Sequence, residues 1–106
     1  MAFAAKVAQS NPAATTATLL YTTPASTKFV GRIVVANRDT VQTSFRLSIR
    51  IAGAGASDAQ YLAYDTPIDG GDIYQSPVIA LAATDLVYVY ATDAECAFTL
   101  VGLEFT

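Results

Sequence analysis

Histidine and tryptophan are absent from this 106-residue chain, and cysteine occurs once, as Cys96. Without histidine the chain lacks the commonest general base and the commonest metal ligand at neutral pH. A single cysteine excludes a disulfide within the chain and cannot form a cysteine-based zinc site alone. We therefore expect no enzymatic activity, no metal and no cofactor. We expect Cys96 to be a small buried hydrophobic residue, with a reactive thiol as the alternative.

Charge is also scarce. Only 14% of the residues are charged and the formal net charge is -3, whereas soluble domains average roughly a quarter charged residues. No cluster of Lys and Arg provides the electrostatic footprint of a nucleic-acid-binding protein. The hydrophobic residues, 53% of the chain, fall into short runs that are too short to cross a bilayer. We expect no nucleic-acid partner, no membrane segment and no secretory signal, and either a large core or a surface covered by partners.

The clearest local pattern lies between Ser44 and Ile51, where Phe45, Leu47, Ile49 and Ile51 alternate with polar residues. A side-chain period of two is typical of a β-strand that buries one face. The pattern therefore predicts a strand with these four apolar side chains in a core. The opposite face carries arginines into solvent or onto a partner.

Other segments rich in β-branched and aromatic residues predict further strands, and no convincing helix is visible. The expected strands cover residues 2–9, 15–23, 28–37, 41–52, 59–64, 73–81, 86–91 and 96–105. We expect a single all-β domain over residues 1–106, an antiparallel β-sandwich or jelly roll of seven or eight strands. Residues 1–14 are expected to form an N-terminal arm or an edge strand.

Several details of this pattern predict local structure. The polar residues 37–40 suggest a turn that joins strands 28–37 and 41–52 in a hairpin, and strand 28–37 is expected to be buried on both faces or central in a sheet. Residues 65–68 are expected to end a strand, with Tyr61 and Tyr64 on opposite faces. Pro77 is expected to interrupt the strand of residues 73–81, and Gly102 marks a bulge or a close approach of two backbones.

Candidate chemistry is sparse. Asp65, Asp69 and Asp72 are the only close group of carboxylates and suggest calcium, but they lack the calcium-loop pattern, and aspartate is ordinary in turns. The tyrosines suggest either a carbohydrate-binding platform or a core and interface role. Arg46 and Arg50, with Arg32 expected nearby, either bind the carboxylates of a partner or form a solvated face.

The order and spacing of six segments resemble a family of small virion structural proteins of tailed bacteriophages. These segments, which span most of the chain from Leu20 onward, are residues 20–25, 34–38, 45–49, 61–68, 87–91 and 98–104. The resemblance implies a non-enzymatic β-sandwich on the virion surface, made in the cytoplasm of a bacterial host. It includes no catalytic residue.

Three functions stay open. The first is a capsid decoration (cement) protein that binds the major capsid protein as symmetric oligomers, expected to be trimers. The second is a tail, baseplate or fibre accessory, and the third, of another class, is a carbohydrate- or calcium-binding module. Arginine and tyrosine are enriched at interfaces, and with the N-terminal segment they give the candidate interface residues: Phe3, Lys6, Val7, Arg32, Arg46, Arg50, Tyr61 and Tyr74.

Overall fold

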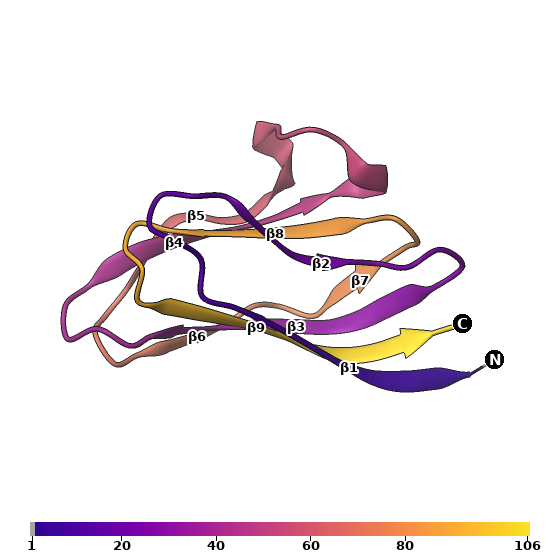
Figure 1. Cartoon of the computed structure of the whole chain (residues 1–106), viewed down its shortest axis with the longest axis horizontal. Coiled ribbons are helices and arrows are strands. Elements are labelled where there is room, and N and C mark those ends of the chain that lie inside the picture. Colours follow the sequence, from indigo (N-terminus) through magenta and orange to yellow (C-terminus); the bar gives the residue numbers. More distant parts are fainter. Residues whose placement is uncertain (1) are drawn as a thin grey trace.

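A computed structural model describes residues 2–106 as two antiparallel sheets that pack face to face (Figure 1). One sheet, here called the β1 sheet, contains β1 (Phe3–Ser10), β9 (Cys96–Phe105), β3 (Lys28–Asn37), β6 (Ile73–Gln75) and β7 (Ile79–Leu81). The other, the β2 sheet, contains β2 (Thr18–Thr22), β8 (Leu86–Ala91), β4 (Thr43–Arg50) and β5 (Tyr61–Ile68). The predicted all-β sandwich is confirmed. Within residues 2–106 the chain forms nine strands, because Pro77 divides one expected strand into β6 and β7.

The core lies between the sheets, and buried residues alternate with more exposed ones along most of β3, β7, β8 and β9. Its largest fully buried side chains come from both sheets and include Phe29, Phe45, Phe98, Ile33, Leu47 and Leu100. The rings of Phe45 and Phe98, one from each sheet, lie 6.4 Å apart between centroids. Burying one such aromatic side chain stabilises the fold by about 2 kcal/mol, so these contacts hold the two sheets together.

On its apolar side, strand β4 follows its predicted alternation with one exception; on the other side Ser48 is buried. Phe45 and Leu47 are fully buried, and Ile49 packs against the core. Ile51, also predicted to be in the core, is 70% exposed. The strand ends at Arg50 because the chain turns into a short 3-10 helix (Ile51–Gly53), in which Ala52 adopts a left-handed backbone conformation. The turn carries Ile51 out of the alternating pattern.

The predicted hairpin between β3 and β4 is wrong. Strand β3 pairs with β9, β6 and β7, whereas β4 pairs with β8 and β5 in the other sheet. The polar segment between them crosses from one sheet to the other. Asn37 holds this crossing, because its buried side-chain amide donates hydrogen bonds to the carbonyls of Val41 and Ile68 and accepts one from the Asp39 amide. Strand β3 is central in its sheet, but its outer side, with Val30 and Arg32, is exposed.

Strand β5 also departs from expectation. It continues through Pro67 to Ile68, which is possible because β5 is an edge strand and proline needs no ladder partner there. Its register against β4 shifts twice, and Asp65 has a left-handed backbone conformation. The shift near Leu62 adds one residue and places Tyr61 and Tyr64 on the same face, with ring centroids 4.8 Å apart. The prediction that they lie on opposite faces is wrong.

The N-terminal segment is an edge strand. Strand β1 pairs with β9 along all eight of its residues, from Phe3 opposite Phe105 to Ser10 opposite Phe98. The N- and C-termini of the chain lie close together in Figure 1. The backbone of Ala2 also exchanges two hydrogen bonds with Thr106. Residues 3–10 are therefore part of the folded sheet.

Two groups that titrate at alkaline pH are buried in this core. Cys96 is fully buried, as predicted, and burial raises the pKa of its thiol to about 11, with Asp93 adding to the rise. Tyr21 is buried and donates a hydrogen bond to Glu104. Burial first, and the carboxylate second, raise the pKa of the Tyr21 hydroxyl above its ordinary value. Both groups therefore hold their protons more tightly in the folded chain than in the unfolded one.

We expect the free energy of unfolding to fall as the pH rises above about 9. At a pH below the pKa that a group has in the unfolded chain, its contribution to the free energy of unfolding is fully present. Above that pKa the free energy of unfolding falls by about 1.4 kcal/mol per pH unit for each group, until the pH reaches the group's pKa in the folded chain. Urea unfolding at pH 8 to 11 measures the slope. The free energy of unfolding of Cys96→Ala should fall less steeply than that of the wild type between pH 9 and 11. An identical slope in both proteins would contradict the assignment to Cys96.

Candidate interaction surfaces

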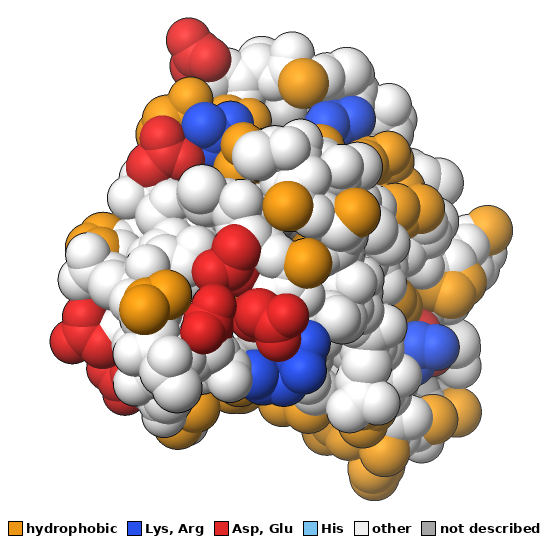
Figure 2. Space-filling view, turned by 60° about the vertical axis from the view of Figure 1, so that its left-hand side comes forward, with side chains coloured by type: hydrophobic (Ala, Val, Ile, Leu, Met, Phe, Trp, Pro, Cys, Tyr) orange, Lys and Arg blue, Asp and Glu red, His pale blue; other side chains and the backbone are white. Residues whose placement is uncertain are grey.

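The outer face of the β1 sheet is unusually apolar. The outward side chains of β1, β9 and β3 form three rows across the sheet, because the register places their residues side by side. The rows run, from β1 through β9 to β3, as Val7–Val101–Arg32, Ala5–Leu103–Val30 and Phe3–Phe105–Lys28. We call these nine residues the apolar face. In Figure 2 hydrophobic side chains project along the lower edge of the molecule, the side on which β1, β9 and β3 lie in Figure 1.

The size of this face is sufficient for a protein contact. Its most exposed hydrophobic residues are Phe3 (69%), Val7 (58%), Val30 (40%), Leu103 (38%) and Val101 (37%). Together they expose about 400 Å² of apolar surface, which is the size of the largest, often functional, patch on a typical monomer. The only charged members, Lys28 and Arg32, lie on β3 at one border. The face thus has an apolar centre and a basic border.

Strand β1 adds an open backbone edge to the apolar face. It is eight residues long, ends its sheet, and contains no proline. Its single charged residue, Lys6, points to the inner side, with its ammonium 5.8 Å from the centre of the Tyr21 ring. A long edge without outward charges offers unpaired backbone groups to another strand. The edge and the apolar face therefore form one continuous surface suited to a protein neighbour.

A second surface lies on the outer side of the β2 sheet. Here a groove of about 220 Å³ crosses the strands. We call it the arginine groove; it is lined by Thr15, Ala17, Arg46, Ser48, Arg50, Tyr61, Tyr88, Val89 and Tyr90. Strand β4 contributes the arginines at alternate outward positions, and β8 contributes Tyr88 and Tyr90 opposite Ser48 and Arg46. The pairing of neighbouring strands places each guanidinium group beside an aromatic ring.

Arg46 is fixed in position by two tyrosine rings and one carboxylate. Its guanidinium carbon lies 4.2 Å from the centre of the Tyr64 ring and 4.3 Å from that of Tyr90. Two hydrogen bonds, of 2.7 and 3.3 Å, join it to the Asp65 carboxylate, which raises the pKa of Arg46 above its ordinary value. Its charge is therefore compensated within the chain, and its side chain is fixed in position.

Arg50 has a different environment. Its guanidinium carbon lies 3.7 Å from the centre of the Tyr88 ring. Within residues 2–106 it forms no ion pair, and its buried Nε has no hydrogen-bond acceptor. A guanidinium is planar, and stacking on an aromatic ring fixes the orientation of that plane, whose N–H groups can bind a carboxylate. Arg50 is thus a positioned positive charge without a counter-charge in the described part of the chain.

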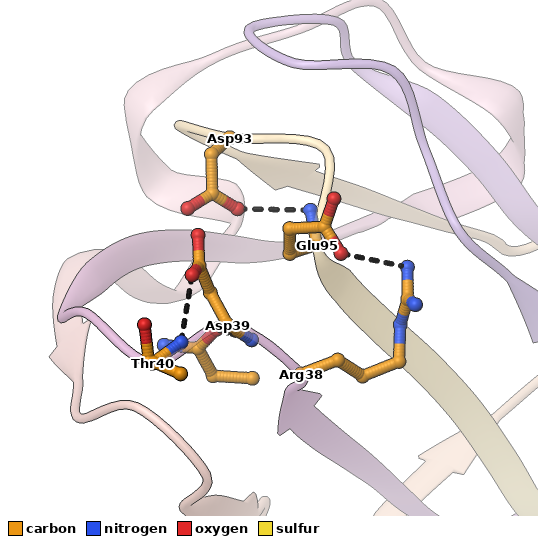
Figure 3. Close-up of polar contacts among 6 residues, drawn as sticks. Arg38, Asp39, Thr40, Asp93 and Glu95 are labelled. Carbon is orange, nitrogen blue, oxygen red and sulfur yellow. Dashed lines mark hydrogen bonds and ion pairs between the residues drawn. The ribbon is translucent and has the colours of Figure 1, made fainter.

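The acidic residues at one end of the sandwich have local structural roles. Figure 2 shows a group of acidic side chains beside a basic one at this end. In Figure 3, the Asp93 carboxylate accepts a hydrogen bond from the Glu95 amide, Asp39 accepts one from the Thr40 amide, and Arg38 pairs with Glu95 at 3.4 Å. Among residues 2–106, no group of three or more histidine, cysteine, aspartate or glutamate side chains is arranged to hold a metal ion.

The candidate interface residues fall into three places. Phe3, Val7 and Arg32 lie together on the apolar face, whereas Arg46, Arg50 and Tyr61 lie in the arginine groove on the opposite sheet. The expectation that Arg32 lies near the other arginines is therefore wrong, because β3 and β4 belong to different sheets. Lys6 points inward, and the half-buried Tyr74 packs on Phe45 at 5.0 Å between ring centroids.

Sequence reasoning missed part of both surfaces. On the apolar face it missed Val30, Val101 and Leu103, which occupy outward positions of largely apolar strands. Only the pairing of β9 between β1 and β3 reveals that these positions face solvent together. In the groove it missed Asp65 as the partner of Arg46. The bulge in β5 turns Asp65 toward β4, and no pattern in the sequence signals that bulge.

Comparison with known proteins gives no assignment. A scan against protein-family models finds no match, and a search of the curated proteins finds none either. Within residues 2–106 the structure contains no helix of the length and hydrophobicity that a membrane crossing requires.

Proposed function

We propose that this chain is a non-enzymatic structural protein of a tailed-bacteriophage virion, a decoration protein that binds the capsid shell as a symmetric oligomer. The observation that carries the proposal is the apolar face, about 400 Å² of hydrophobic surface next to an open eight-residue strand edge. The sequence resemblance supports the same class of protein. We expect the decoration protein to be a trimer that contacts the major capsid protein.

The occupant of the apolar face is a second copy of this chain. A standard stable interface buries about 800 Å² on each partner. The hydrophobic centre alone exposes about half of that area, roughly 400 Å². Because the basic border lies on β3 alone, a neighbouring copy can pack on the hydrophobic centre without facing Lys28 and Arg32 directly. Burial of the hydrophobic centre supplies the free energy of association.

Val7→Lys tests this surface. Val7 is 58% exposed at the end of one row, so a lysine there leaves the core intact but places a charge in the proposed contact. We expect at least tenfold weaker self-association in sedimentation equilibrium, with a melting temperature that matches the wild type at concentrations where both proteins are monomeric. The matched control is Val41→Lys, since Val41 is also 58% exposed but lies between β3 and β4. A wild-type protein that stays monomeric at all concentrations, or equal losses in both variants, would refute the assembly surface.

The copy number in purified particles tests the virion function. Quantitative mass spectrometry against the major capsid protein should find copies comparable to that protein if the chain decorates the shell. A small symmetric set would instead place it on the tail, baseplate or fibre. Absence from clean particles would refute a virion role and favour a free binding module.

Two features bear on that binding module. The carbohydrate reading needs free aromatic faces, but Arg50 stacks on Tyr88, and Arg46 lies between Tyr64 and Tyr90. A calcium site would require the carboxylates of Asp65, Asp69 and Asp72 to lie close together. Each has a separate contact instead: Asp65 with Arg46, Asp69 with Gln42 and Asp72 with the Ile73 amide. Neither observation favours a second function.

A further inference from the structure

We infer that the arginine groove binds one acidic side chain of a protein partner, with Arg50 as the residue that pairs with its carboxylate. This inference deepens the proposed function, on which its choice of a protein partner rests: the partner is a virion protein that presents an aspartate or glutamate to the outer face of the β2 sheet. The apolar face on the opposite sheet stays free for the second copy of the chain.

The charges in the groove favour a carboxylate. Arg46 is neutralised by Asp65, so the pair contributes no net charge, and Arg50 leaves a single positive charge in the groove. One monoanionic carboxylate balances that charge, whereas a dianionic phosphate would leave a negative charge beside Asp65. A charged group that is partly desolvated gains most from a partner of equal and opposite charge.

The geometry also favours a side chain over a larger ligand. Drug-sized ligands occupy pockets of roughly 300–1,000 Å³, and this groove has about 220 Å³. The volume accommodates one side chain with part of its backbone. Arg46, fixed between two tyrosine rings, forms a rigid wall, and Ser48 and Tyr61 line the groove beside it.

The stacking of Arg50 explains why this arginine is suited to the role. An arginine in free solution must lose several side-chain rotations when it binds a carboxylate, but one that already stacks on Tyr88 has lost part of that freedom before binding. The positive charge of the Arg50 guanidinium is then presented in a fixed orientation. A lysine would supply charge at this position but no planar group to stack.

Nitrogen-15 NMR of the arginine side chains tests the site. The probe is N-acetylglutamate α-amide, which presents one glutamate side chain, and the control probe is N-acetylglutamine α-amide, a neutral analogue of the same shape. We expect saturable shifts of the Arg50 Nε–H signal with the glutamate probe, with a Kd on the order of millimolar for this small fragment. Arg50→Gln removes that signal, so its binding is followed by the Arg46 Nε–H signal and should be at least tenfold weaker.

The matched control is Arg32→Gln, which removes an exposed arginine from the opposite sheet and should leave binding unchanged. Equal shifts with the glutamine probe, or equal losses in Arg32→Gln, would overturn the site. Tighter binding of inorganic phosphate than of the glutamate probe would overturn the choice of a carboxylate. The NMR titration and the particle experiment can fail independently. If the chain is absent from virions but still binds the glutamate probe, the proposed function is refuted and the carboxylate site is not.

Discussion

Gly102→Ala is expected to lower the free energy of unfolding by about 3 kcal/mol and the melting temperature by about 15 °C. Gly102 lies opposite Gly31 in the central pair of the β1 sheet, and the ring of Phe29 covers both. A Cβ atom at position 102 would lie 2.2 Å from the Val30 carbonyl oxygen and 2.7 Å from the Gly31 Cα. Because these contacts are with backbone atoms, β3 and β9 must separate to admit the methyl group.

The control for this effect is Gly55→Ala. Position 55 lies in the exposed loop before β5, and a Cβ atom there would meet nothing within 4 Å. We expect its free energy of unfolding to stay within about 0.5 kcal/mol of the wild type. Denaturant unfolding of the three proteins measures both values. A Gly102→Ala protein as stable as Gly55→Ala would show that the two backbones tolerate a wider separation than the structure has.

Asn37→Ala is expected to cost about 3 kcal/mol of unfolding free energy, because it leaves buried carbonyl groups without donors. Asn37 is 2% exposed at the end of β3. Its amide nitrogen lies 2.9 Å from the carbonyl oxygen of Val41 and 3.1 Å from that of Ile68. Ile68 ends β5 in the other sheet, so a single side chain connects the two sheets at this crossing.

Gln75→Ala provides the comparison for Asn37→Ala, since Gln75 is exposed at the end of β6. Its substitution should change the free energy of unfolding by less than about 0.5 kcal/mol. Asn37→Asp adds a second test, because aspartate keeps the acceptor for the Asp39 amide but directs a carboxylate at two carbonyl groups. It should be at least as destabilising as alanine. If either Asn37 variant were as stable as the wild type, the proposed structural role of the Asn37 amide would be refuted.

The sequence predicted most strands because their signals are local. Alternation placed Phe45 and Leu47 in the core, and Pro77 divided β6 from β7 because proline cannot donate to a ladder. Gly102 was predicted to mark a bulge or a close approach, and the structure has the close approach. The burial of Cys96 was predicted from its single occurrence in a hydrophobic strand. Each of these features depends on a residue and its immediate neighbours.

The pairing of strands could not be predicted in the same way. A polar segment such as residues 37–40 has the composition of a hairpin turn, whether the chain returns to the same sheet or crosses to the other. The inward amide of Asn37 selects the crossing, and its acceptors, at positions 41 and 68, are brought together only in the folded chain. The bulges of β5, which place Tyr61 and Tyr64 on one face, likewise arise from the register against β4.

The sequence by itself determined that this protein is an all-β sandwich with few charges and many apolar positions to cover, because alternation and composition act on each strand separately. Only the tertiary structure decided which apolar positions face solvent together. Val7, Val101 and Val30 form one surface because β9 lies between β1 and β3. Among residues 2–106, Arg50 has no counter-charge, because the pairing of β5 with β4 places Asp65 beside Arg46. Both results depend on contacts between residues far apart in the chain, which local patterns do not encode.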